Sequence, residues 1–566
     1  MNLANARLPF ALALVALLAA CGSMAPGAAP VALPLGADPA AACVSLGAPV
    51  PAAAIGLPSG QAVIDSAVWT PARALAVAER GATPAARVTP ALPAFCKLLG
   101  QIAPLDPAAP PVRFQVNLPA QWNGRTVQYG GGGFNGVLID ALALVPAQRF
   151  DTPPPLALGY VTYGTDSGHQ NKPGEPPQTF ALNDEALLNF AHASYKKVRD
   201  VAVALVQRAY GQRPARLYFV GSSEGGREGM VMAQRYPADF DGIFSRVPVL
   251  NWTGLQHAGL RDGRATMAEG WIRPAQTQRV HQAVLAACDA ADGLADGIIA
   301  DPVACRQLFD PAQLRCKSVL DDACLTEPQI LAIKTLGSPF RFDFDLAHGV
   351  REYPGRGPSG EGLPAFGPTG GWQAWWLGSS APSLPPVQAN SIAWFYGAGA
   401  IQYFYAQDPK ADLMRYQPAR HRARIEQVSA LMDATDPDLS AFQARGGKLL
   451  LLENLADYAQ SPYAGIQYHK SVVQRMGQAK VDGFFKLYTA PGVDHVGSGA
   501  PSQLDMLAAL TAWVEQGRAP QGLQLVQQTV AAPFAVERAR PLCEWPLVPR
   551  YQGGDADLAA SFLCRR

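Results

Sequence analysis

The chain has 566 residues, of which 49% are hydrophobic and 16% charged, and its formal net charge is +1. That length exceeds one compact core, so we expect a large domain that carries an insertion. The balanced charge argues against a nucleic-acid partner, and the apolar content excludes a disordered chain. Nothing in the sequence indicates the oligomeric state.

The first 21 residues predict an export signal. Residues 8–20 form an apolar run behind Arg7 that is too short to span a bilayer as a helix. The run ends in LAAC, which resembles a bacterial lipobox with Cys21 as the lipidated residue; an ordinary signal peptide is the alternative. We expect an exported protein, either a periplasmic or outer-membrane lipoprotein held only by this lipid, or a secreted one. Residues 22–42 are Ala/Pro/Gly-rich and predict a flexible tether.

The remaining cysteines are even in number, which indicates disulfides in an exported protein. Sequence alone does not fix their connectivity. Pairing of nearest neighbours would give Cys43–Cys96, Cys288–Cys305, Cys316–Cys324 and Cys543–Cys564.

Short apolar runs that alternate with helical patterns predict a mostly parallel sheet flanked by helices. In chain order, the expected strands are 114–118, 126–129, 158–163, 217–220, 449–452 and 484–488, and the expected helices are 183–210, 228–236, 468–476 and 504–515. Residues 250–434 are rich in Trp, Pro and Gly and interrupt this pattern. We therefore expect an α/β core built from residues 43–249 and 435–566, with residues 250–434 forming an inserted lid domain.

The sequence GSSEG at 221–225 matches G-x-S-x-G between an expected strand and an expected helix. In that context the central residue, Ser223, sits on a strained turn that presents its hydroxyl, and the outer glycines avoid clashes. A plain glycine-rich turn is the alternative. The motif predicts the nucleophile elbow of an α/β-hydrolase fold, with Ser223 as the nucleophile.

A serine hydroxyl needs a base, which in this fold is a histidine placed after the acid and the nucleophile in the chain. His495 meets this order, in a glycine-rich loop after an expected strand. His169 precedes the serine, and His469 lies in an expected helix. We predict His495 as the general base.

The acid should follow a strand between the serine and the histidine. Asp457 does so, directly after the strand at 449–452. Glu453 is still within the strand, and Asp494 is adjacent to His495 and therefore poorly placed to orient its ring. We predict Asp457, whose role would be to fix the imidazole tautomer.

Two backbone N–H groups should form an oxyanion hole. One belongs to Glu224, the residue after the nucleophile, and the other to the glycine run at 130–133, with Gly133 as the expected donor. A flexible turn is the alternative reading of that run.

The segment GSSEGGREGM at 221–230 resembles the nucleophile region of the tannase/feruloyl esterase family, which includes hydrolases of mono(2-hydroxyethyl) terephthalate. Residues 433–442, PGVDH at 491–495 and the segments around Cys543 and Cys564 resemble the family too. The resemblance implies a triad of Ser223, Asp457 and His495, with the lid contributing to the substrate pocket.

One departure from the family pattern concerns a disulfide beside the triad. The family has a Cys before the catalytic serine and another after the catalytic histidine, whereas Ser222 and Val496 occupy those positions here. We therefore expect a triad held by packing and hydrogen bonds alone.

An Asp/Gly-rich loop at 288–298 predicts a structural calcium site. Hard cations bind several carboxylate and carbonyl oxygens, and the expected Cys288–Cys305 bridge would close the loop; a solvated turn is the alternative. The resemblance implies Ca²⁺ here, held by the side chains of Asp289, Asp292 and Asp296 and the backbone oxygens of Leu294 and Ile298. We expect no organic cofactor.

The expected lid is rich in aromatic side chains, and some of them could enclose an aromatic acyl group. They are Trp372, Trp375, Trp376, Trp394, Phe395, Tyr396, Tyr403, Phe404 and Tyr405. No Arg or Lys lies between Trp372 and Gln407 to grip a substrate carboxylate. We therefore expect a serine esterase for small neutral esters of feruloyl or galloyl type. Hydrolysis of terephthalate monoesters is the alternative, and a non-catalytic binding lipoprotein is the alternative of another class.

Overall fold

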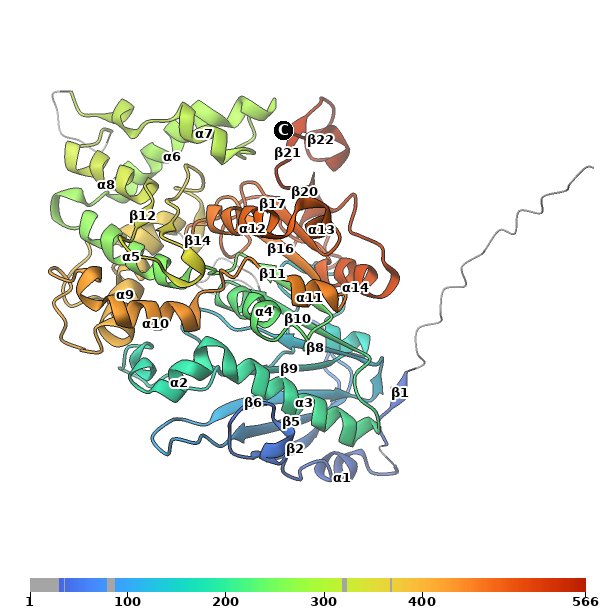
Figure 1. The fold of residues 1–566 in the computed structure, drawn as a ribbon. Coiled ribbons are helices and arrows are strands. Elements are labelled where there is room, and N and C mark those ends of the chain that lie inside the picture. The colour runs from blue at the N-terminus through green and yellow to red at the C-terminus, as the bar shows by residue number, and fades with distance from the viewer. Residues whose placement is uncertain (1–29, 35, 79–86, 318–322, 367–368) are drawn as a thin grey trace, which may run out of the picture.

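The computed structural model describes residues 30–34, 36–78, 87–317, 323–366 and 369–566. A ten-stranded sheet runs through its centre (Figure 1). The strands, in spatial order, are β2 (Ala62–Thr70), β5 (Phe95–Ile102), β6 (Val112–Pro119), β9 (Val161–Thr165), β8 (Arg125–Tyr129), β10 (Arg216–Ser222), β11 (Gly242–Arg246), β16 (Lys448–Asn454), β17 (Phe485–Ala490) and β20 (Cys543–Glu544).

The parallel part of the sheet is its middle. All neighbours from β9 to β17 pair in parallel. The pairs at the two edges are antiparallel. The predicted mostly parallel sheet is confirmed for the strands that carry the candidate site.

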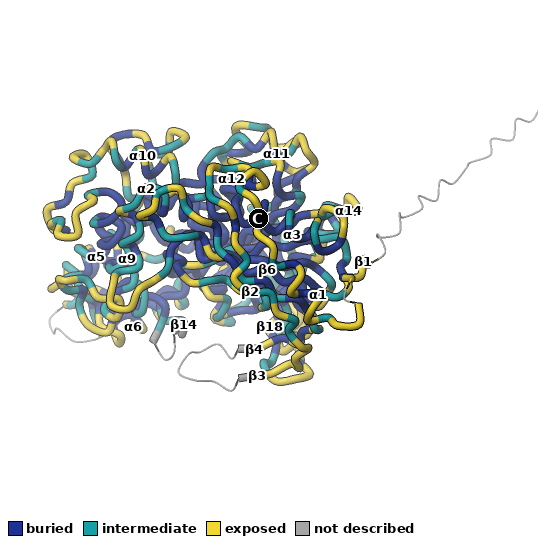
Figure 2. Tube along the Cα trace, turned by 90° about the horizontal axis from the view of Figure 1, so that it is seen from below, coloured by how far each residue is buried: buried dark blue, intermediate teal, exposed yellow. Residues whose placement is uncertain are grey.

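Both faces of the middle strands are covered, which explains their continuous apolar sequences. Because successive side chains point to opposite faces, Leu449 and Leu451 join one core cluster and Leu450 and Leu452 join the other. The first cluster contains side chains of α4 (Glu224–Arg235) and α12 (Tyr463–Met476), and the second contains those of α14 (Met506–Gln516). Figure 2 shows buried residues in the interior and exposed residues on the outer loops.

Several predicted boundaries differ from the observed ones. Helix α12 begins at Tyr463, five residues before its predicted start. The helix after the nucleophile begins at Glu224, directly behind the turn, and not at Glu228. The strand expected from residue 158 begins at Val161, because Pro155–Leu158 forms a 3₁₀ turn that Gly159 ends with a φ of +84°. The helical pattern at 183–210 is confirmed as α2 (Asp184–Leu188), a π-helical turn (Asn189–Ala193) and α3 (Ser194–Tyr210).

The segment from 250 to 434 leaves the sheet at the end of β11, and the chain returns to the sheet at the neighbouring strand β16. It forms a mainly helical layer beside the sheet (Figure 1). We call residues 250–434 the inserted segment. Its helices are α5 (Trp252–Ala265), α6 (Pro274–Cys288), α7 (Pro302–Leu308), α8 (Glu327–Gly337), α9 (Ile392–Gly399) and α10 (Arg422–Met432).

The expected tether is too long at its C-terminal side. Val31–Ala32 forms a short strand, β1, that pairs with β7 (Gln121–Trp122), and Leu33 is buried. Helix α1 (Pro39–Val44) follows, capped by Asp38 and tied to β5 by a disulfide. The expected lipidation site, Cys21, and the rest of the signal lie outside the described residues.

The four expected disulfides are confirmed: Cys43–Cys96, Cys288–Cys305, Cys316–Cys324 and Cys543–Cys564. The last bridge joins β20 to β22 (Phe562–Arg565), which pairs with β21 (Val548–Tyr551). In the part of the chain described above, no helix has the length and apolar character needed to cross a bilayer.

Candidate active site

Ser223 occupies the turn between β10 and α4, with a φ of +62° that L-residues rarely adopt. The flanking glycines make this turn possible. A Cβ on Gly221 would lie 2.1 Å from the carbonyl oxygen of Gly225, and a Cβ on Gly225 would lie 2.6 Å from that of Gly131. The turn therefore requires both glycines of the motif.

The structure brings Ser223, His495 and Asp457 together. Nε2 of His495 lies 3.0 Å from Oγ of Ser223, and Nδ1 of His495 lies 2.7 Å from Oδ2 of Asp457. Oδ1 of Asp457 accepts hydrogen bonds from the N–H groups of Ala459 and Gln460. The carboxylate is thus fixed by its own loop while it orients the imidazole.

The loops that carry the acid and the histidine are bonded to each other. Nδ2 of Asn454 donates to the carbonyl oxygen of Asp494 at 2.6 Å, and the N–H of Ala456 donates to that of Val493 at 3.0 Å. These bonds set the distance between Asp457 and the ring of His495.

The two competing carboxyl groups have other environments. Oδ1 of Asp494 accepts the N–H groups of Val496, Gly497 and Ser498 and so shapes the histidine loop, and burial raises the pKa of Asp494 to about 6. Glu453 is buried in β16, and burial followed by the charge of Asp457 raises the pKa of its carboxyl well above its usual value. Within the described part of the chain, the ring nitrogens of His495 bond to Asp457 and Ser223.

The two other candidate histidines pack against aromatic rings. His169 is buried and stacks on Phe180 with ring centroids 3.7 Å apart, and burial lowers its pKa to about 3. His469 lies on α12 against Phe485. Both positions agree with a structural role.

The glycine run is held against α4 by a buried carboxylate. Oε2 of Glu228 accepts the N–H of Gly131 at 2.9 Å, and Oε1 accepts Nδ2 of Asn135 and the hydroxyl of Tyr195, both at 2.6 Å. Gly133 and Glu224 then line the same cavity as Ser223. The expected oxyanion donors therefore lie on the two segments that meet at the serine.

The cavity at Ser223 has a volume of about 280 Å³ and mainly apolar walls. The core contributes Phe134, and the inserted segment contributes Trp252, Trp375 and Tyr396. The ring of Tyr396 meets that of Phe134 edge-to-face at 5.0 Å, and the ring of Trp375 lies 6.0 Å from that of His495. The other lid aromatics are mostly core: Trp376, Trp394, Phe404 and Tyr405 are buried.

Ser222 and Val496 stand where the family has the two cysteines of a disulfide. Oγ of Ser222 accepts a hydrogen bond from Nη1 of the buried Arg246 at 3.2 Å, and Val496 is 45% exposed. Burial lowers the pKa of Arg246, while Asp494 is the first of the acidic groups that counteract it. The strand end before the nucleophile is thus contacted by a guanidinium.

The expected calcium loop is held by internal bonds. Oδ2 of Asp289 accepts the N–H of Gly297 at 2.9 Å, and Oδ2 of Asp296 pairs with Nη2 of Arg540 at 2.5 Å. Burial, helped by the charges of Asp296 and Asp289, raises the pKa of Asp292 to about 6. Among the described residues, no group of three or more His, Cys, Asp or Glu side chains is arranged to hold a metal ion. The oxygen-rich donor set suits calcium, but Asp296 would have to leave Arg540, so the calcium site stays a prediction.

The sequence did not predict the roles of Glu228, Asn135 and Tyr195, which fix the glycine run, or of Arg246 beside Ser222. One signal was available for Glu228, since it is an acidic residue between Gly225–Gly226 and the apolar MVM at 230–232, inside an expected buried helix. The partners on other segments have no local signal.

A serine on a strand–turn–helix elbow, bonded to a histidine and an aspartate that follow it along a mainly parallel sheet, defines an α/β-hydrolase. The sequence model described as "Tannase and feruloyl esterase" matches residues 96–565. The chain therefore belongs to the tannase and feruloyl esterase family, and it is a carboxylic ester hydrolase.

Named relatives agree with this assignment. An uncharacterized esterase of Agrobacterium fabrum is 37% identical over 83% of this chain and 85% of its own. The mono(2-hydroxyethyl) terephthalate hydrolase of Piscinibacter sakaiensis is 32% identical over 90% of this chain and 89% of its own. The crystal structure of feruloyl esterase B from Aspergillus oryzae superposes with a TM-score of 0.72 over 92% of this chain and 99% of that one, at 23% identity, and so confirms the fold. The four disulfides are typical of exported proteins.

Proposed function

We propose that this esterase hydrolyses neutral esters of small aromatic acids through an acyl-Ser223 intermediate. One observation carries the proposal: Oγ of Ser223 and Nε2 of His495 lie 3.0 Å apart, in a cavity whose walls include Trp252, Trp375 and Tyr396. A nucleophile and its base need this hydrogen bond, and aromatic walls suit a flat ring.

Acylation begins when His495 takes the hydroxyl proton of Ser223 as Oγ attacks the ester carbonyl carbon. Asp457 stabilises the imidazolium that forms. The carbonyl oxygen becomes an oxyanion, which accepts the N–H groups of Gly133 and Glu224. When the tetrahedral intermediate collapses, the imidazolium returns the proton to the leaving alkoxide, and the alcohol departs.

Deacylation repeats these steps with water. His495 removes a proton from water as the water oxygen attacks the acyl carbon. The proton then passes to Oγ of Ser223 as the acid leaves. The same imidazole serves as base and acid in both halves, so its position relative to Asp457 controls both rates.

The composition of the cavity supports an uncharged acyl group. Of the described residues that line the cavity at Ser223, none is Lys or Arg, and its polar side chains besides Ser223 and His495 include Gln256 and Gln460. A substrate carboxylate would lose hydration there without gaining a cationic partner. Phenolic hydroxyls can instead bond to amides, which favours hydroxycinnamoyl or galloyl esters over terephthalate monoesters.

A panel of esters tests the proposed substrate class. We expect kcat/KM for methyl ferulate or methyl gallate to exceed that for mono(2-hydroxyethyl) terephthalate, and Ser223→Ala to abolish turnover of all three. A preference for the terephthalate monoester would overturn the proposed class while leaving the serine mechanism intact. If Ser223→Ala keeps its activity toward all three esters, the serine mechanism is overturned.

We also propose a structural calcium ion in the loop of Asp289, Asp292 and Asp296, with the carbonyl oxygens of Leu294 and Ile298. The support is a donor set made of oxygens, on a loop that the Cys288–Cys305 bridge closes. These residues do not line the cavity at Ser223, so the ion would stabilise the inserted segment and take no part in catalysis.

Finally, we propose that the exported chain is anchored through a lipid on Cys21. The support is the LAAC sequence behind a short apolar run. Growth with a radiolabelled fatty acid should label the protein, and Cys21→Ala should remove the label. A protein that is released without lipid would overturn the anchor but not the esterase activity.

A further inference from the structure

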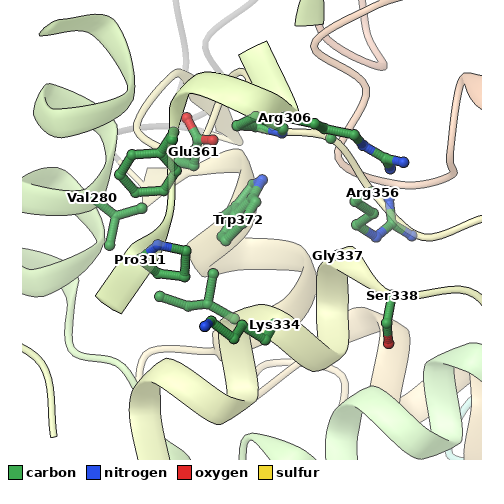
Figure 3. A pocket seen from close by; sticks show the side chains of 13 residues that line it. Val280, Arg306, Pro311, Lys334, Gly337, Ser338, Arg356, Glu361 and Trp372 are labelled. Carbon is green, nitrogen blue, oxygen red and sulfur yellow. The ribbon is translucent and has the colours of Figure 1, made fainter. Parts of the chain in front are cut away.

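A second cavity, of about 330 Å³, lies within the inserted segment (Figure 3). Its walls come from α6, α7 with the residues that follow it, α8, residues Arg356–Pro358, Glu361 and Trp372. It shares no lining residue with the cavity at Ser223. Its volume lies at the lower end of the range of small-molecule sites, which suits a ligand with one ring.

The middle of this cavity is apolar. Val280, Phe309, Pro311 and Ile333 line it, together with the indole of Trp372, which is nearly buried. Such walls bind an aromatic ring by excluding water and by stacking.

One wall carries a buried acceptor. The side chain of Glu361 is 1% exposed; its Oε2 lies 3.3 Å from Nδ1 of His281, and its Oε1 has no hydrogen-bond partner among the described residues. Nearly all buried carboxylate oxygens accept hydrogen bonds, because an unpaired one is costly. A ligand hydroxyl would supply the missing donor.

The charge of the cavity favours an anion. Lys334, Arg306 and Arg356 line it against the single carboxylate of Glu361. The guanidinium of Arg356 donates hydrogen bonds to the carbonyl oxygens of Tyr458 and Ala459. Lys334 is 49% exposed and pairs with the exposed Asp310 at 3.2 Å. Because an exposed ion pair contributes little free energy, a ligand carboxylate can replace Asp310 as its partner.

The acceptor, Glu361, and the exposed cation, Lys334, lie at opposite ends. In Figure 3, Glu361 and Lys334 stand on opposite sides of Trp372. We propose that this cavity binds a one-ring aromatic acid with a hydroxyl group at the far end from its carboxylate. The ring lies against Trp372, the hydroxyl donates to Oε1 of Glu361, and the carboxylate pairs with Lys334. Binding in this cavity does not depend on catalysis by Ser223.

Calorimetry with 4-hydroxycinnamate tests the site, and two analogues test the two ends of the ligand. We expect cinnamate, which lacks the hydroxyl, and 4-hydroxycinnamamide, which lacks the carboxylate, each to bind about tenfold more weakly, since a hydrogen bond to a charged group contributes at least this factor. Glu361→Gln should weaken 4-hydroxycinnamate but not cinnamate. Lys334→Met, a change at the half-exposed rim that spares the fold, should weaken the acid but not the amide.

Two controls separate this cavity from the one at Ser223. Lys410→Met removes an exposed lysine elsewhere in the inserted segment and should leave the affinity unchanged. Leu255→Trp fills the cavity at Ser223, which Leu255 lines, and should also leave it unchanged. Loss of binding in Leu255→Trp, or wild-type affinity for 4-hydroxycinnamate in Lys334→Met, would overturn the proposal.

Discussion

The carboxylate of Glu228 accepts the backbone N–H of Gly131, with Oε2 2.9 Å from the nitrogen. Its other oxygen binds Asn135, the residue that also accepts the N–H of Gly132 through Oδ1. The helix that begins behind Ser223 therefore holds the glycine run that contains the proposed second oxyanion donor, Gly133. One buried side chain couples the position of the nucleophile to the position of the hole.

The change Glu228→Gln tests this coupling. An amide replaces one acceptor oxygen with a donor, so either Gly131 or the Asn135–Tyr195 pair loses its partner, and Gly133 shifts. We expect kcat to fall by about 10²-fold, the size of effect seen when an oxyanion donor is misplaced, with little change in KM. Steady-state kinetics measures this split.

A matched control for that variant is Glu515→Gln, because Glu515 also accepts two partners, Arg125 and Tyr218, but away from the cavity at Ser223. It should lower the melting temperature without lowering kcat. If both variants lose kcat in proportion to their loss of stability, Glu228 has only a structural role.

The two aspartates near His495 should differ sharply in their effect. Asp457→Asn keeps the size of the side chain but stabilises the wrong imidazole tautomer, so kcat should fall by about 10⁴-fold. Asp494→Asn keeps an oxygen for the N–H groups of Val496, Gly497 and Ser498 and should retain most of the activity. Equal losses in the two variants would contradict the assignment of the acid.

The absent disulfide beside the triad can be introduced as Ser222→Cys with Val496→Cys. A bridge between these positions would close a loop of several hundred residues and raise the melting temperature by constraining the unfolded chain. We also expect kcat to change, because the bridge replaces the contact of Ser222 with Arg246. Identical melting temperature and activity in the oxidised and reduced forms would show that this clamp is irrelevant here.

Purified protein should contain about one calcium ion per chain if the loop at 288–298 binds it as proposed. Chelation should lower the melting temperature, and calcium rather than magnesium should restore it, because several protein oxygens suit the larger ion. Asp292→Asn should weaken the effect. If metal analysis finds no calcium and chelation leaves the melting temperature unchanged, the proposed calcium site is wrong.

The sequence predicted the parts of the site whose signals are local. The G-x-S-x-G turn, the order of acid and histidine and the pairing of nearest cysteines each depend on short segments, and the structure places Ser223, Asp457 and His495 in mutual contact as expected. Glu228 and Gly131 are 97 residues apart, and Ser222 and Arg246 belong to adjacent strands. Such contacts depend on the register of a finished sheet, which no local pattern encodes.

In the inserted segment, too, contacts between distant residues could not be predicted from local sequence patterns. Its aromatic content predicted a contribution to the cavity at Ser223, and Trp375 and Tyr396 do line it, but most of the other rings are core. The cavity around Glu361 and Trp372 had no sequence signal at all, because its walls come from three helices and a loop that meet only after folding. Similarly, the N-terminal tether was overestimated because the pairing of β1 with β7 depends on a distant partner strand.

Rapid mixing with 4-nitrophenyl ferulate, followed by intact mass and peptide mapping, tests the acyl-serine pathway most directly. We expect a burst of one equivalent of nitrophenolate per enzyme, a mass increase equal to one feruloyl group, and its localisation to the peptide that contains Ser223. Ser222→Ala should keep the burst and Ser223→Ala should lose it. An acyl group on another residue, or a burst that persists in Ser223→Ala, would contradict the central claim.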